Sequence, residues 1–456
     1  MTDQHVRDGL RGFVELVPVH PNLAAVLAPR PRRPRRAWLV PALAAAAVLA
    51  VLTPVVALPD APPPPRPADG GITLPRQFPA HSTSIPLLAD APTGPAIAFY
   101  RQSVGHVDFD HGEAYVAGAT ADTYRRLGIK EESGARLSPD GTRLALGDCS
   151  GKNPVVTLVD LATDARRTLR LDPPRVKASQ GWSTVTAPRA WSPDGRYLVV
   201  STYADTFCNI PVISGPLWLL DTETGSYHQL AADQKPSPNR PTLVAFAPDG
   251  KRIAVQLDTR LTIMDLDGRT IRELDVPPGQ EIAGAQAWSP DGTLLVLITQ
   301  QGRILPDPNS PPMIAFLDAT GTAATVPAPV HAGFVIPAWR NPVLGWKDPG
   351  TFLVLVSLTG KDYASAEADN PRILQFHVTG GGAEVLATLR PGPDRSVAAT
   401  DVQLAVALVP AMGTRAGPPA ATRPRPRWLT PAIVAGALTL LAGGWLIVRR
   451  IRTRRP

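Results

Sequence analysis

The densest group of side chains that could bind a metal or move a proton lies in the segment HVDFDHGE, which contains His106, Asp108, Asp110 and His111. Imidazole and carboxylate groups are common metal ligands and general bases. However, Asp108 and Asp110 would share one face of a strand, and the neighbouring sequence supplies no further ligand. The run Asp-His-Gly also aligns with a turn that recurs along the chain. We therefore interpret the segment as a degenerate hairpin.

Asp265, Asp267 and Gly268 resemble part of a calcium loop, but the later ligand positions of an EF-hand are missing. The sequence contains no G-x-S-x-G elbow, no H-E-x-x-H zinc motif, no P-loop and no G-x-G-x-x-G dinucleotide motif. We therefore expect no catalytic residue, no metal site and no cofactor, and we do not expect an enzyme.

The stretch AWSPDGRYLVV (190–200) contains the turn that recurs. Pro193 presets φ for the first central position of a tight turn, Asp194 tolerates the second, and Gly195 can adopt a positive φ. Apolar residues on both sides predict a β-hairpin. Comparable turns, each followed by a short apolar run, predict a repeat protein with structural turn acids at Asp110, Asp140, Asp194, Asp249, Asp291 and Asp348.

A second half-unit follows most copies, for example LWLLDTETG (217–225) and LTIMDLDG (261–268). It is an apolar strand that closes on an Asp/Thr/Gly turn, and a further strand follows. Four strands per unit predict the blades of a β-propeller, an all-β fold. Six copies predict six blades, with seven as the alternative. AIAFYR (96–101) and VQLAVALV (402–409) are the candidate strands for closing the ring.

The WSPDG hairpins resemble those of TolB-like and WD40-like propellers over roughly residues 95–410. The chain departs from true WD repeats because no Gly-His and Trp-Asp pair frames each unit. The resemblance implies a fold and a binding role, and it carries over no catalytic residue. The composition, rich in Ala, Arg and Pro, resembles that of high-GC bacteria, in which membrane-anchored TolB-like propeller proteins of the cell envelope are common.

The two cysteines, Cys149 and Cys208, follow the second strands of consecutive blades, which places them in equivalent loops on one face. Because we expect the propeller to lie outside the cytoplasm, where disulfides persist, we predict a disulfide between them. Two free thiols are the alternative.

Positive charge is concentrated at the two ends of the chain. The total of +7 divides into +4 for residues 1–36 and +5 for residues 449–456, which leaves −2 for the rest. A near-neutral body between basic ends is not a phosphate-binding footprint, so we expect no nucleic-acid partner.

The basic ends flank two uncharged apolar runs, residues 37–58 and 428–448, each long enough to span a bilayer. By the positive-inside rule both termini are cytoplasmic, and the propeller is extracytoplasmic. The expected localisation is the cell membrane, with two spans. Cleavage of the first run as a signal peptide stays an alternative.

The remaining segments complete the expected organisation. Residues 1–36 form a basic cytoplasmic segment with an amphipathic helix, and residues 59–94 are a Pro-rich linker. The propeller ectodomain spans residues 95–410, a Pro/Arg linker spans 411–427, and a basic cytoplasmic tail spans 449–456.

We expect this protein to act by binding a partner. Long irregular segments at 203–215, 300–313 and 359–371 lie on one face of the predicted disc, where a protein partner would bind. We expect a non-enzymatic scaffold or sensor that binds a protein or envelope ligand. The alternative is a transmembrane signalling protein whose N-terminal cytoplasmic helix binds a regulator such as a sigma factor.

Overall fold

The computed structural model describes residues 71–80, 82, 84–102, 113–129, 134–149, 154–172, 183–205, 215–230, 242–299, 313–321, 325–331, 342–356, 371–380, 382–389 and 401–417. These residues belong to one compact unit, Pro63–Arg425. Both apolar runs and both basic ends lie outside the described residues. Within the described part, no helix has the length and apolar character needed to cross a bilayer.

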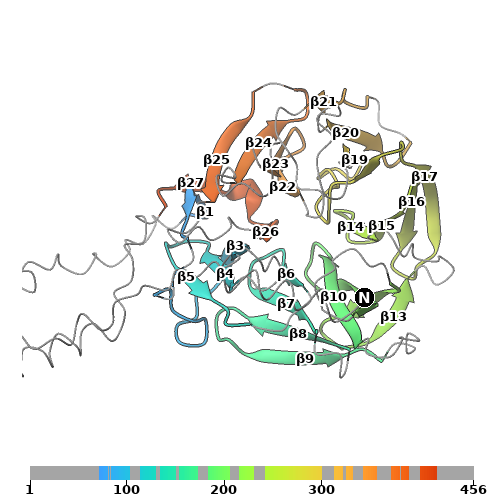
Figure 1. Ribbon diagram of the computed structural model, residues 1–456. Coiled ribbons are helices and arrows are strands. Elements are labelled where there is room, and N and C mark those ends of the chain that lie inside the picture. Colours follow the sequence, from blue (N-terminus) through green and yellow to red (C-terminus); the bar gives the residue numbers. More distant parts are fainter. Residues whose placement is uncertain are drawn as a thin grey trace, which may run out of the picture. The chain divides into compact units, whose positions relative to one another are not determined.

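Six antiparallel sheets radiate from a common centre, as expected for a six-bladed propeller (Figure 1). From the innermost strand outward, blade 1 is β26 (Asp401–Leu404), β3 (Ala96–Gln102), β4 (Glu113–Gly118) and β5 (Tyr124–Arg126). Blade 2 is β6 (Ala135–Leu137), β7 (Arg143–Gly147), β8 (Val155–Asp160) and β9 (Arg166–Arg170). Blade 3 is β10 (Ser183–Trp191), β11 (Tyr197–Asp205), β12 (Leu217–Asp221) and β13 (Tyr227–Leu230).

Blade 4 is β14 (Leu243–Phe246), β15 (Arg252–Leu257), β16 (Arg260–Asp265) and β17 (Thr270–Asp275). Blade 5 is β18 (Gln280–Ile282), β19 (Leu294–Thr299), β20 (Met313–Asp318) and β21 (Val330–His331). Blade 6 is β22 (Val343–Asp348), β23 (Thr351–Val356), β24 (Arg372–His377) and β25 (Glu384–Leu389). The expectation of six blades is confirmed, and the seven-bladed alternative is wrong.

The ring closes through strands from the two ends of the propeller. β26 pairs antiparallel with β3, with Asp401 opposite Arg101 and Leu404 opposite Ala98. Blade 1 therefore takes its innermost strand from the C-terminal side and its other three strands from the N-terminal side. The two segments expected to close the ring do so, and no edge is left open at the junction.

This closure corrects the alignment of Asp110. In blades 2 to 6 the recurrent turn joins the first and second strands, whereas residues 103–112 join β3 and β4, the second and third strands of blade 1. Asp110 and its neighbours His106, Asp108 and His111 lie outside the described residues. Their segment is nevertheless not the counterpart of the SPDG turns, because the strand that would precede such a turn in blade 1 is β26.

Three short strands lie in segments that the sequence pattern assigns to linkers. β1 (Thr73–Pro75) pairs parallel with β27 (Gly413–Arg415), and β2 (Gln77–Phe78) adds to the outer edge of blade 6 beside β25. A 3-10 turn, Val409–Ala411, precedes β27. The expected linkers 59–94 and 411–427 therefore each contribute to the folded unit. The strands that pair here come from distant parts of the sequence, and local composition does not predict such contacts.

Burial follows the position of each strand in its blade. The central strand β23, with the sequence TFLVLV, is buried at every residue, whereas no residue of the outer strand β17 is fully buried. Central strands pack against a neighbouring blade on both faces, so they consist of continuous apolar runs. Each fully buried Val, Leu or Phe side chain stabilises the fold by about 1.5–3 kcal/mol.

Candidate functional site: tight turns and central channel

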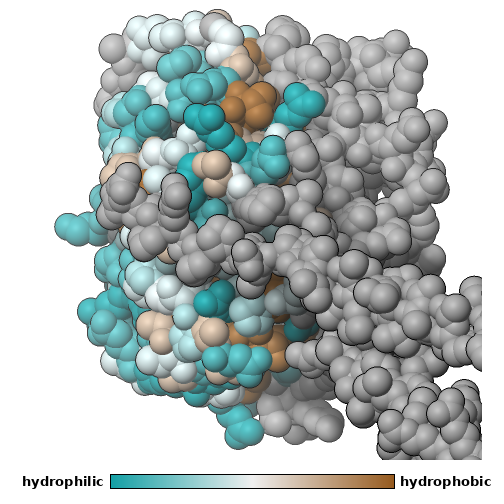
Figure 2. Space-filling view, turned by 90° about the vertical axis from the view of Figure 1, so that its left-hand side faces the viewer, coloured by the Kyte–Doolittle hydropathy of each residue, from teal (hydrophilic) through white to brown (hydrophobic). Residues whose placement is uncertain are grey.

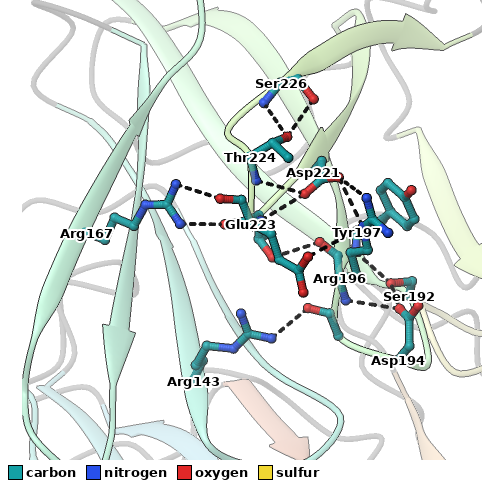
Figure 3. A network of polar contacts seen from close by, with 12 residues as sticks. Arg143, Arg167, Ser192, Asp194, Arg196, Tyr197, Asp221, Glu223, Thr224 and Ser226 are labelled. Atoms are coloured by element: carbon teal, nitrogen blue, oxygen red, sulfur yellow. Dashed lines mark hydrogen bonds and ion pairs between the residues drawn. The ribbon is translucent and has the colours of Figure 1, made fainter.

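The SPDG turns are held by a repeated set of hydrogen bonds. In blade 3, Ser192 Oγ donates to Asp194 Oδ1 at 2.5 Å and accepts from the Tyr197 N–H at 2.8 Å (Figure 3). The Gly195 N–H donates to the Ser192 carbonyl at 2.9 Å, and the φ of Gly195 is +71°. One serine thus links the turn acid to the strand that follows it.

The same arrangement recurs in two other blades. In blade 2, Ser138 donates to Asp140 at 2.6 Å, and in blade 5, Ser289 donates to Asp291 at 2.5 Å. Partial burial opposes ionisation of Asp140 and Asp291, but the hydrogen bonds that these carboxylates accept outweigh it and lower their pKa. These acids are therefore structural acceptors.

Blades 4 and 6 use variants of this turn. In blade 4 an alanine, Ala247, replaces the serine, and Asp249 accepts instead from the Lys251 N–H at 2.8 Å and from Arg252 Nε at 2.7 Å. In blade 6, Asp348 Oδ1 accepts from the Gly350 N–H at 2.8 Å. Five of the six expected turn acids thus hold turns between first and second strands, and Asp110 does not belong to this set.

The turns between third and fourth strands share this face of the disc and are also tied internally. Asp221 Oδ1 accepts from the backbone N–H of Glu223 and Thr224 at 2.9 and 3.1 Å, and its other oxygen accepts from Arg196 at 2.8 Å. Arg167 reaches across from blade 2 and donates to the Thr222 and Glu223 carbonyls (Figure 3). We call this the tight-turn face.

The partial calcium-loop pattern is one of these turns. Asp265 Oδ1 accepts from the Arg269 N–H at 2.8 Å, and Asp267 forms an exposed ion pair with Arg269 at 3.3 Å. Among the described residues, no three His, Cys, Asp or Glu side chains gather in a way that could hold a metal ion.

The opposite face carries the connections between second and third strands. Cys149 is half-buried and lies two residues after β7 in such a connection. Cys208 lies outside the described residues, in the equivalent connection of blade 3. Both cysteines thus fall in second-to-third connections of adjacent blades along the chain, and their pairing stays a prediction.

No family model and no curated protein matches the sequence. Among solved structures, the chain is similar to TolB from Acinetobacter baumannii, with 13% identity, a TM-score of 0.40, and coverage of 68% of this chain and 65% of that one. A putative TolB from Agrobacterium tumefaciens is 16% identical, with a TM-score of 0.38 and coverage of 68% and 97%. Kuenenia stuttgartiensis hydrazine synthase is 17% identical, with a TM-score of 0.36 and coverage of 62% and 69%. These likenesses are distant and concern the propeller fold.

A small cavity of about 30 Å³ lies where the innermost strands converge. Its lining comes from five of the six blades and consists of Arg136, Leu137, Ala190, Trp191, Ala285, Gln286, Val343, Leu344, Val402, Gln403 and Leu404. Most of these side chains are apolar, and Arg136 is the only charged residue among them. We call this space the central channel.

Gln403 ties blade 1 to blade 2 beside this channel. Its Oε1 accepts from the Leu137 N–H at 3.0 Å, and its Nε2 donates to the Ala135 carbonyl at 2.8 Å. Trp191 ties blade 3 to blade 2 in a similar way, because its Nε1 donates to the Arg136 carbonyl at 3.0 Å. The tryptophan of the WSPDG motif is thus a bridge between blades.

Arg136 is the one charged residue of the lining, and it bonds to the backbone of a second arginine, Arg189. Arg136 Nε donates to the Arg189 carbonyl at 2.9 Å, and Arg189 Nε donates to Ser201 Oγ at 2.6 Å. Desolvation lowers the pKa of both guanidinium groups, and each is also affected by a neighbouring arginine. Sequence reasoning missed this group, because Arg136 and Arg189 stand 53 residues apart and only blade packing joins them.

Proposed function

We propose that this protein is a non-enzymatic binding scaffold or sensor, anchored in the cell membrane, whose extracytoplasmic propeller binds a protein or envelope ligand on the face opposite the tight turns. The observation that carries the proposal is the difference between the two faces. First-to-second turns such as 138–142 and 192–196 are short, and their polar groups bond to one another.

The connections on the other face are longer in three blades. Residues 206–216, 300–312 and 357–371 join the second and third strands of blades 3, 5 and 6. Long connections on a rigid scaffold are where binding residues concentrate, because they vary without disturbing the core. Large hydrophobic side chains that are exposed among the described residues are scattered over different blades: Ile271, Val326 and Val385. On the side seen in Figure 2, hydrophilic residues cover most of the coloured surface.

The electrostatics of the turn acids fit a structural role and not proton transfer. An efficient general acid or base has a pKa near the working pH. Asp140, Asp249 and Asp291 have pKa values shifted away from neutrality, because the hydrogen bonds they accept outweigh desolvation. They stay ionised and hold the turns.

The membrane anchors of this proposal rest on the two apolar runs, 37–58 and 428–448, and on the arginine clusters beside them. Together they orient the propeller outward and keep both ends in the cytoplasm. A scaffold tethered at both ends would present one disc near the membrane surface.

Site-specific photo-crosslinking of the full-length chain in cells tests the binding face. A photoreactive amino acid is placed singly at Leu305 or Tyr363, in the long connections, and at Glu223 or Asp267, on the tight-turn face. We expect discrete adducts from the first pair and none from the second. Adducts confined to the tight-turn positions would contradict the proposal.

A shortened variant provides the matched control. Replacing residues 302–310 with a Gly-Ser pair leaves Cys208 in place and removes only the tip of one connection. We expect loss of the crosslinked partner with an unchanged thermal unfolding midpoint. Glu223→Gln, on the tight-turn face, is expected to leave capture unchanged.

A further inference from the structure

Strands β1 and β27 form a two-stranded ribbon of their own beside the blades, and we call this ribbon the clasp (Figure 1). The strands are parallel, with Pro75 opposite Arg415. At one end of the ladder the Gly413 N–H donates to the Ile72 carbonyl at 2.9 Å. At the other end the Arg76 N–H donates to the Arg415 carbonyl at 2.8 Å. The clasp thus joins the start of the described chain to its end.

Arg415 fastens the clasp to blade 1. Its side chain is only 9% exposed, and its Nε donates to Asp122 Oδ1 at 2.8 Å. Its Nη1 donates to Thr73 Oγ1 at 2.9 Å, and its Nη2 donates to the Gly118 carbonyl at 3.0 Å. One guanidinium therefore bonds to the opposite strand and to blade 1 at the same time. Hydrogen bonds with an ionised donor and acceptor are stronger than neutral ones.

The chain just after β27 is held as closely. A side chain at Gly417 would overlap the backbone of Gln77, so the two backbones lie in direct contact there. Gln77 belongs to β2, which adds to the outer edge of blade 6 beside β25. The clasp is therefore attached to the blades on both sides of the ring closure.

The direction of the clasp strands decides how they carry tension. Because β1 and β27 are parallel, a pull on the chain before β1 and after β27 slides the two strands past each other along their length. All the hydrogen bonds between the strands are then loaded at once. A ladder loaded in this way resists force better than one whose bonds break singly.

The ring closure has the opposite geometry. β26 and β3 are antiparallel, and Leu404 at the end of β26 lies opposite Ala98 near the start of β3. A pull on the chain before β3 and after β26 acts at this one end of the ladder. It would separate the bonds one after another, which requires less force. The closure is therefore weak against the tension that the clasp resists.

We propose that the clasp is a force-bearing lock, which carries tension applied between the chain before β1 and the chain after β27 and keeps that tension off the six blades. This inference goes beyond the proposed function and does not depend on what the propeller binds. While the clasp is closed, the load passes directly from one strand to the other. Resistance to force then depends on the rate at which the clasp opens, and not on the equilibrium stability of the blades.

Single-molecule pulling on the full-length protein in detergent tests the lock, with attachment tags inserted after Ala68 and after Thr422. At constant force we expect one opening event before any blade unfolds. Arg415→Gln should shorten the lifetime of the closed clasp by about tenfold or more, since hydrogen bonds to charged groups are the strong ones. Arg167→Gln, which removes bonds between blades 2 and 3, is the matched control and should leave this lifetime unchanged.

A covalent bond across the clasp separates its opening from all other events. The Cβ of a residue at position 413 would lie 3.8 Å from Thr73 Cγ2, so Thr73→Cys with Gly413→Cys places two thiols side by side. Oxidation of this double variant should abolish the first event, and reduction should restore it. Thr73→Cys alone is the control and should show the event under both conditions. Misfolding of the variant cannot produce a reversible loss.

Three outcomes would overturn the proposal. They are a first event that persists in the oxidised double variant, blades that unfold before any such event, and a closed-state lifetime of Arg415→Gln equal to that of the native protein. None of them bears on the proposed binding face, which photo-crosslinking from Leu305 or Tyr363 tests separately.

Discussion

At the scale of single residues, the serine that precedes Pro-Asp-Gly links the turn acid to the strand that follows. Ser289 Oγ donates to Asp291 and accepts from the buried N–H of Leu294 at 2.9 Å. Blade 4 manages without this hydroxyl, because Asp249 there accepts directly from Arg252. The turn therefore tolerates alanine only where another donor and acceptor have been arranged.

We predict that Ser289→Ala lowers the free energy of unfolding by about 1–3 kcal/mol, because it leaves the buried N–H of Leu294 without an acceptor. The matched control is Ala247→Ser, which restores the serine at the equivalent position and should change stability by less than about 0.5 kcal/mol. Denaturant titration of both variants measures the difference. Equal effects of the two changes would contradict the assigned role of the hydroxyl.

Acid should destabilise the turns through their carboxylates. The pKa of Asp140, Asp249 and Asp291 is lowered in the folded state, so that state binds fewer protons than the unfolded chain. Their contribution to stability is therefore present above the unfolded pKa of about 3.9 and is lost as the pH falls through the folded pKa.

We expect the free energy of unfolding to decrease between about pH 5 and pH 3, and we expect Asp291→Asn to flatten this dependence, since an amide does not titrate. Denaturant titrations at a series of pH values measure the slope. A variant slope equal to the native one would show that Asp291 is not among the responsible groups.

At the scale of elements, side-chain amides join neighbouring blades where no backbone ladder does. Gln403 bonds both backbone groups that flank Arg136, and Gln256 does the same between blades 4 and 5 by accepting from the Ile282 N–H at 2.6 Å and donating to the Gln280 carbonyl at 3.1 Å. These bonds fix the inner ends of adjacent blades relative to each other. Gln403 matters most, because β26 lies next to the junction of the two chain ends.

We predict that Gln403→Ala destabilises the propeller by about 2 kcal/mol, because the Leu137 N–H loses its acceptor in the core and the Ala135 carbonyl keeps only its bond from Arg136. Hydrogen exchange should rise first in β26 and β3. Gln229→Ala, on the outer strand β13, is the control and should stay within about 0.5 kcal/mol of the native protein. A rise in exchange spread evenly over all blades would argue against a local opening at the closure.

The predicted disulfide is a second link between blades. Cys149 and Cys208 belong to the second-to-third connections of blades 2 and 3, so a bond between them would staple these blades. We expect peptide mapping of the unreduced full-length protein to recover the two cysteines in one linked species. Cys149→Ser should cost up to about 4 kcal/mol by the chain-entropy estimate for such a loop. Recovery of two alkylatable thiols from exported, folded protein would exclude the bond.

At the scale of the whole molecule, closure makes the propeller depend on both of its ends. β1 pairs with β27 and β26 pairs with β3, so the residues next to the two apolar runs are bound to one another within the folded unit.

We predict that a reporter active only in the cytoplasm gives signal when fused after Pro456 and none when inserted after Thr422, between β27 and the second apolar run. By the positive-inside rule, the arginine clusters beside both runs predict this orientation. A reporter active only outside the cytoplasm should give the reverse pattern. Cytoplasmic signal from the Thr422 insertion would refute the two-span arrangement.

What the sequence alone could establish depends on interactions between residues that lie close together in the chain. Pro, Asp and Gly in the order of SPDG specify a tight turn, and the apolar runs around it specify hairpins, so the repeat follows from residues close together in the chain. Five of the six blades carry such a turn, and the sixth blade is completed only by closure of the ring. The same locality explains the structural role of Asp140, Asp194 and Asp291, whose partners lie within three residues. The membrane spans rest on the sequence and stay predictions.

Tertiary structure decided the rest, because it depends on contacts between distant residues. The alignment of Asp110 with the SPDG turns was wrong because the innermost strand of its blade comes from residues 401–404. Strands β1, β2 and β27 form only by pairing with partners more than 300 residues away along the chain. Arg136 and Arg189 likewise meet only after blades 2 and 3 pack, since contacts between such distant residues leave no trace in local sequence pattern.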